Sequence, residues 1–95
     1  MMSRDLKHLV DYIHYVNQFW HLALETSDHG MAQLFKRRKS SLQKKLLTHF
    51  HDQVKLDFDA ETSAQTAQDV YVIRINSGGD ACHIPKSDLE ESGFL

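Results

Sequence analysis

The chain has 95 residues, 41% of them hydrophobic and 25% charged, and a formal net charge of −2. These values are typical of one small folded domain, and no apolar run approaches the about 20 residues that a membrane span needs. The N-terminal residues lack the basic start and apolar core of a secretory signal, and Cys82 has no second cysteine to pair with. We therefore expect a cytoplasmic protein without a disulfide.

The first helix is predicted over residues 3–27. Ser3 is a suitable N-cap, Asp5 lies where the helix dipole favours a negative charge, and Gly30 is a stop signal. The polar residues of this helix fall on one narrow stripe, at spacings of three or four: Lys7, Asp11, His14, Gln18, His21 and Glu25.

Between residues 5 and 25 most of the remaining positions are apolar or aromatic, over roughly two-thirds of the circumference, whereas an ordinary surface helix shows an apolar arc of roughly 100° or somewhat more. One neighbouring helix cannot cover so wide an arc. We therefore predict a second packing partner, either the chain's own sheet or another copy of the protein. We assign this contact to the aromatic residues Tyr12, Tyr15, Phe19 and Trp20.

The second helix is predicted over about residues 31–50, and the short link to it implies an antiparallel hairpin. Lys39 interrupts its apolar face, which otherwise comprises Met31, Phe35, Leu42, Leu46 and Phe50. Either the helix breaks at Ser40-Ser41, where Ser40 and Gln43 have capping-box spacing, or it is continuous and Lys39 reaches out from the edge of the apolar face. The good helix formers around this point favour the continuous helix.

A period-two pattern begins at residue 53 and predicts a half-buried strand that includes Val54, Leu56 and Phe58. Residues 60–68 are small and polar and are expected to form a loop. The β-branched and aromatic residues of segment 69–76 predict a second strand.

A turn is expected at residues 77–80, and a short third strand over 81–84 that Pro85 ends or confines to an edge. Ser87 and Glu90 have capping-box spacing and Gly93 follows as a stop, which predicts one C-terminal helical turn. The order α-α-β-β-β defines an α+β fold in which a helical hairpin packs on a three-stranded antiparallel sheet. We assign residues 1–95 to a single domain, with the hairpin over 3–52 and the β-meander and final turn over 53–95.

Charge is distributed unevenly along the chain. Residues 29–58 carry seven basic and two acidic side chains, whereas residues 59–95 carry seven acidic and two basic ones. On a continuous second helix an outward basic face is formed by Lys36, Arg37, Lys44 and Lys45. Such a face suits an acidic protein or a nucleic acid, although no known nucleic-acid-binding motif is present.

Seven histidines are many for a chain of this size, but no Cys-x-x-Cys or His-Glu-x-x-His spacing accompanies them. The candidate ligands of a metal site or an enzyme centre are His49, His51, Cys82 and His83. Cys82 and His83 are adjacent on a predicted strand and so point to opposite faces, which argues against a nucleophile and its base. A lone cysteine in an apolar strand is more often a buried small hydrophobe.

These observations lead to a leading hypothesis and an alternative. The leading hypothesis is a small non-enzymatic binding or regulatory protein, homodimeric, that uses the basic face to bind an acidic protein or nucleic acid and needs no cofactor. The alternative is a small metal-binding protein or enzyme that uses the four histidine and cysteine residues named above.

Overall fold

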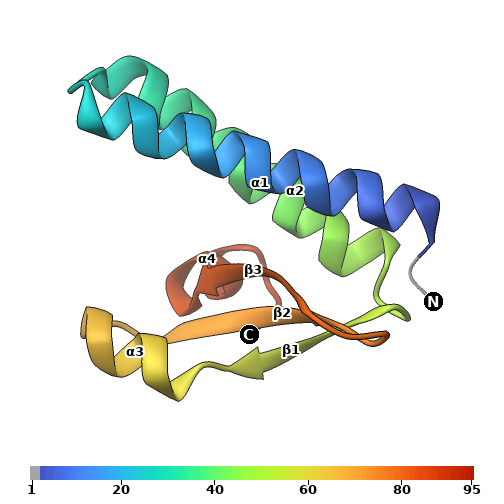
Figure 1. Ribbon diagram of the computed structural model, residues 1–95. Coiled ribbons are helices and arrows are strands. Elements are labelled where there is room, and N and C mark those ends of the chain that lie inside the picture. The colour runs from blue at the N-terminus through green and yellow to red at the C-terminus, as the bar shows by residue number, and fades with distance from the viewer. Residues whose placement is uncertain (1–2) are drawn as a thin grey trace.

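The computed structural model describes residues 3–95, so the first two residues of the predicted domain lie outside the described residues. The predicted fold class is confirmed, because two helices are followed by a three-stranded antiparallel sheet and a short C-terminal helix (Figure 1). The elements are α1 (Arg4–Glu25), α2 (His29–His49), β1 (Val54–Phe58), α3 (Ala60–Thr66), β2 (Val70–Ile75), β3 (Asp80–Pro85) and α4 (Lys86–Glu91).

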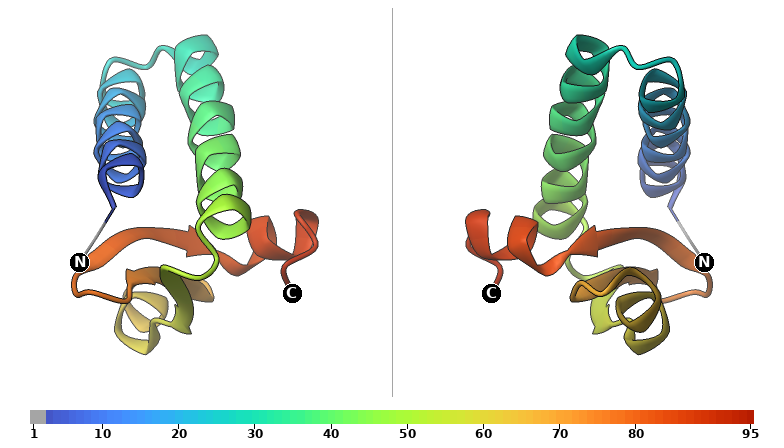
Figure 2. Two further views of the ribbon diagram at one scale, coloured as in Figure 1. Left: turned by 90° about the vertical axis from the view of Figure 1, so that its right-hand side faces the viewer. Right: turned by 90° about the vertical axis from the view of Figure 1, so that its left-hand side faces the viewer.

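The hairpin of α1 and α2 lies over the sheet at one end and rises away from it at the end that carries the α1–α2 link (Figures 1 and 2). The strand order is β1-β2-β3, with Val54 of β1 opposite Ile75 of β2. The pairing of β2 with β3 shifts register between Ile73 and Arg74. The small helix α3 connects β1 to β2, and α4 follows β3 directly.

The core lies between the sheet and the half of the hairpin that rests on it. Leu6 and Ile13 of α1, Leu46 of α2 and Ile73 of β2 are at most 1% exposed. The other buried members of this cluster are Leu9, Val10, Val54, Ile75, Ala81, Ile84 and Leu89. Towards the raised end of the hairpin the buried apolar residues outside this cluster are Val16, Ala23 and Ala32, so the two nearest the link are small.

The predicted start of α1 is confirmed, since the Ser3 hydroxyl accepts a hydrogen bond from the Leu6 amide at 3.2 Å. The predicted stop at Gly30 is wrong. The helix ends at Glu25, and Ser27 takes the left-handed conformation with φ 59°. Asp28 then caps α2 by accepting from the Met31 amide at 3.1 Å, so Gly30 lies inside the first turn of the next helix. The boundary between the two helices is therefore set by the Asp28 cap of α2 and not by Gly30.

Helix α2 is continuous through Ser40 and Ser41, which confirms the favoured interpretation and excludes the alternative break at this point. Lys39 lies half-buried at the edge of the apolar face, and its Nζ donates to Asn17 Oδ1 at 2.7 Å. The interruption of the apolar pattern therefore marks a lysine whose aliphatic stem is buried and whose ammonium is held by α1.

The predicted loop over 60–68 is wrong, because residues Ala60–Thr66 form α3. Asp59 caps this helix, accepting from the Thr62 amide at 3.0 Å and from the Thr62 hydroxyl at 2.8 Å. The C-terminal turn is a helix, α4, that starts after Pro85 without a side-chain cap, so the predicted capping role of Ser87 is wrong. Gly93 has φ 81°, which agrees with its predicted role as a stop.

Gln43 of α2 joins the hairpin to the sheet. Its side chain is 1% exposed, and its Nε2 donates to the backbone carbonyl of His83 at 2.9 Å. Since β3 is an edge strand, this bond satisfies a carbonyl that the sheet ladder leaves available.

Candidate functional site

A patch of large apolar side chains is exposed on the hairpin. We call it the hairpin face, and its members are Tyr12, Tyr15, Phe19 and Leu22 of α1 with Met31 and Leu34 of α2. The α1 residues follow spacings of three, four and three, which is the pattern of a helix seam that packs on another helix. Tyr15 and Phe19 are 61% and 50% exposed, so the chain's own sheet does not cover them.

The hairpin face contains a shallow hollow of about 200 Å³, lined by α1 and α2 residues that include Tyr12, Val16 and Phe35. The Phe19 and Phe35 rings stack across the hairpin with centroids 5.7 Å apart. Arg38 is the one charged residue of the described chain that lines the hollow, and its guanidinium lies 3.5 Å from the Tyr12 hydroxyl. The hollow therefore offers an apolar recess beside exposed aromatic side chains.

The structure brings together three of the four residues predicted for the basic face. Lys36, Arg37 and Lys44 line a groove of about 500 Å³ with Ser40, and we call this the basic groove. Its opposite wall is α4, which contributes the carboxylates of Asp88 and Glu91. Lys45 lies elsewhere, in a separate depression beside Asp5 and His49.

A fourth depression lies where the raised half of the hairpin leaves the sheet, and we call it the hairpin–sheet groove. Its volume is about 440 Å³, and four parts of the fold line it: α1, α2, α3 and the β2–β3 region. Its lining residues are Ile13, His14, Asn17, Trp20, His21, Lys39, Thr62, Thr66, Val70, Cys82, His83 and Pro85. Trp20, which we predicted in the dimer or sheet contact, therefore lies beside this groove and not on the hairpin face.

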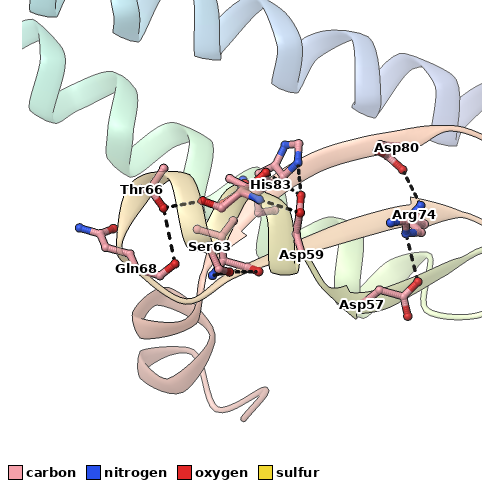
Figure 3. A network of polar contacts seen from close by, with 11 residues as sticks. Asp57, Asp59, Ser63, Thr66, Gln68, Arg74, Asp80 and His83 are labelled. Atoms are coloured by element: carbon pink, nitrogen blue, oxygen red, sulfur yellow. Dashed lines mark hydrogen bonds and ion pairs between the residues drawn. The ribbon is translucent and has the colours of Figure 1, made fainter.

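The residues of the metal-binding alternative do not come together. Among residues 3–95, no group of three or more histidine, cysteine and acidic side chains is arranged to hold a metal ion. His49 and His51 lie at the end of α2, where His51 Nδ1 is 3.2 Å from the Thr48 carbonyl oxygen. His83 Nε2 pairs instead with Asp59 Oδ2 at 2.9 Å, as Figure 3 shows.

Cys82 lies half-buried between the hairpin and the sheet. Burial raises the pKa of its thiol to about 11, and a contact with Gln43 and the charge of Lys39 only partly oppose this shift. At neutral pH the thiol is therefore protonated, which is the unreactive form of a cysteine. The environment of Cys82 suits a packing role rather than that of a nucleophile.

Two features of these sites were not found from the sequence. The first is Asp59, which directly precedes the segment 60–68 predicted as a loop, although aspartate is a preferred N-cap residue. Lys39 reaches out from the edge of the apolar face, as predicted for a continuous helix, but its partner was not predicted. Its contact with Asn17 depends on the register between two helices, which the sequence pattern of either helix alone does not contain.

Comparison of the chain with models of protein families, with curated proteins and with solved structures yields no match. Within residues 3–95, none of the helices combines the length and the apolar character that crossing a membrane requires.

Proposed function

We propose that the protein is a non-enzymatic binding module that acts as a homodimer, with the hairpin face as the contact between two copies. The observation that carries the proposal is the exposure of large apolar side chains in the spacing of a helix seam, between 42% and 61% for the six residues of the hairpin face. Soluble monomers rarely leave a contiguous apolar patch of this kind open, and such patches mark interaction sites.

The size and shape of the hairpin face suit a second copy of the chain. A large aromatic side chain has about 150–250 Å² of surface, so six half-exposed residues offer on the order of 500 Å² per copy. A symmetric pair would then bury about 1,000 Å², the lower bound for a specific interface. Tyr15 is 61% exposed beside the hollow of about 200 Å³, so each copy presents both a protruding ring and a recess.

The oligomeric state tests this proposal. We expect light scattering of a dilution series to show a dimer that dissociates in the Tyr15→Glu variant, because a carboxylate would have to be desolvated at an apolar interface. The dissociation constant should rise at least about a hundredfold. The control is Gln18→Glu, which adds the same charge on the exposed polar stripe of the same helix. A monomer at every concentration, or a Tyr15→Glu variant that dimerises like the unchanged chain, would refute the proposal.

The basic groove is the surface that we propose for a partner of the dimer. Lys36, Arg37 and Lys44 offer cations to an acidic partner, while Asp88 and Glu91 on the facing wall would repel a continuous row of phosphates. This combination favours an acidic protein segment that also carries basic residues over a nucleic acid.

NMR titration distinguishes these two partners. We expect a short peptide rich in glutamate with interspersed lysine to shift the amide signals of α2 and α4 around the groove, and a DNA duplex to shift them less at the same salt concentration. Reversal of Lys36 and Arg37 to glutamate should abolish the peptide effect, whereas Lys45→Glu, outside the groove, should preserve it. A stronger response to DNA would mean that the groove binds nucleic acid.

A further inference from the structure

The hairpin–sheet groove has the dimensions and composition of a small-molecule site. Its volume of about 440 Å³ falls in the range of about 300–1,000 Å³ that is typical of ligand pockets. It lies between separate parts of the fold, and it is lined by apolar surfaces together with a few polar groups from different elements. It is distinct from the hairpin face, so the inference below does not depend on the proposed dimer.

Lys39 is the one cationic side chain, apart from histidines, among the described residues that line this groove. Its Nζ donates to Asn17 Oδ1 at 2.7 Å and lies 5.0 Å from the centroid of the Trp20 ring. Within residues 3–95 no carboxylate lies at ion-pair distance from the Lys39 ammonium. Asp88 interacts with it electrostatically over a longer distance. The ammonium is thus held in place by an amide and an aromatic ring, and its charge is not neutralised by a neighbouring acid.

Burial lowers the pKa of Lys39 from its ordinary value. The charges of Cys82 and Asp88 oppose this shift in part, and Lys36 adds a smaller effect in the lowering direction. A lysine that is desolvated without a neutralising partner is stabilised when an anion approaches it. An ammonium has three donor hydrogens, and one of them is used by Asn17. Lys39 therefore has donor capacity left for a ligand.

The rest of the groove favours a negatively charged ligand. None of the described residues that line it is acidic, and His14, His21 and Asn17 provide further hydrogen-bond donors. Asp59 is paired with the groove residue His83 at 2.9 Å, and its oxygens also accept hydrogen bonds from the amide and hydroxyl of Thr62. This carboxylate is thus already hydrogen-bonded within the protein.

The apolar part of the lining defines the body of the ligand. Trp20 and Pro85, which are both half-buried, form surfaces on which a flat ring can pack, and the buried side chains of Ile13 and Val70 lie at the edge of the core below them. A single lysine beside such surfaces matches one carboxylate on an apolar body better than it matches a phosphate, which would need more cations and would leave the apolar walls uncovered.

We propose that the hairpin–sheet groove binds an aromatic carboxylate, with Lys39 as the anchor of the carboxylate and Trp20 and Pro85 as walls for the ring. Trp20 is the single tryptophan of the chain, so its fluorescence reports occupation of this groove directly. The probe is benzoate, and its uncharged counterpart is benzyl alcohol.

We expect benzoate to change the Trp20 emission in a saturable manner, and to shift the NMR amide signals of Thr62, Val70 and Cys82 at the same concentrations. Benzyl alcohol should bind at least about tenfold more weakly, because it lacks the charge that Lys39 recognises. Inorganic phosphate should not displace benzoate at equal concentration. Equal binding of the alcohol, or displacement by phosphate, would overturn the proposed ligand class.

Lys39→Met tests the anchor, since methionine keeps the apolar stem and removes the ammonium. We expect this variant to bind benzoate at least about tenfold more weakly while its circular dichroism spectrum is unchanged. The matched control is Lys45→Met, which makes the same change on the same helix outside this groove. Because Lys39 contacts Trp20, affinity in both variants is measured from the amide signals of Val70 and Cys82. Undiminished binding by Lys39→Met, or equal losses in both variants, would overturn the proposal.

Discussion

Gln43 provides the most direct test of how the hairpin is fixed on the sheet. Its Nε2 donates to the His83 carbonyl at 2.9 Å, and the residue is 1% exposed. In Gln43→Met the apolar side chain fills a similar volume, so packing changes little while the hydrogen bond is lost. The His83 carbonyl, which takes part in a part-buried hydrogen bond, then loses this donor.

Loss of a partner for a buried carbonyl costs about 1–3 kcal/mol. For a domain of this size, each kcal/mol lowers the unfolding temperature by about 4–8 °C. We therefore expect Gln43→Met to melt about 5–20 °C below the unchanged chain. The measurements are thermal and urea unfolding followed by circular dichroism, at one protein concentration so that any association affects all samples equally.

The matched control is Gln33→Met, the same substitution at an exposed position of the same helix. We expect its free energy of unfolding to stay within about 0.5 kcal/mol of the unchanged chain. If Gln43→Met were as stable as Gln33→Met, water or another group would satisfy the His83 carbonyl, and the account of how α2 protects the edge of β3 would be wrong.

Three further predictions concern single residues. Because burial raises the pKa of Cys82 to about 11, iodoacetamide should label the native protein slowly at pH 8 and faster only towards pH 11. Equally fast labelling of the native and the urea-unfolded chain at pH 8 would contradict this prediction. Hydrogen bonds from the Thr62 amide and then the Thr62 hydroxyl lower the pKa of Asp59, so its contribution to stability is complete above the pKa of an unfolded aspartate and is lost as the pH falls through the lower folded value. A carbon-13 NMR titration should therefore give Asp59 a lower pKa than the aspartates of the unfolded chain. An unshifted pKa would contradict the proposed hydrogen bonds from Thr62 to Asp59. Ser27→Gly should stabilise the protein by about 0.5 kcal/mol, because Ser27 has φ 59° and glycine adopts this conformation without strain. The control Ser41→Gly, inside α2, should destabilise it by about 0.5–1 kcal/mol. A loss of stability in both variants would exclude the left-handed conformation of Ser27.

The fold class and most elements could be predicted from periodicity, because each pattern extends over several turns or alternations. The strand around Val54, Leu56 and Phe58 and the long helices are examples. Helix α3 was not found, because its small polar residues have no apolar periodicity and its formation depends on the cap from Asp59. Gly30 does not mark the end of α1, which lies at Glu25, because the Asp28 cap begins α2 before the glycine is reached.

The candidate sites were less predictable than the fold. The wide apolar arc of α1 predicted that some aromatic residues would remain uncovered, but only the tertiary arrangement separates Tyr15 on the hairpin face from Trp20 beside the hairpin–sheet groove. The basic residues were grouped by helical spacing alone, and the position of α4 decides which of them share a groove with Asp88. Contacts between distant segments are set by packing and are not encoded in one segment's pattern.

The raised end of the hairpin has a consequence for local opening. The large buried side chains Leu6, Ile13 and Leu46 secure the end that lies over the sheet, whereas Ala23 and Ala32 are the fully buried apolar residues near the link. Because few buried apolar contacts oppose opening there, amide hydrogens should exchange with solvent fastest around Ser27 and progressively more slowly towards Leu46. If two copies associate through this region, exchange near the link should slow as the protein concentration rises, so a gradient of exchange rates would report assembly residue by residue.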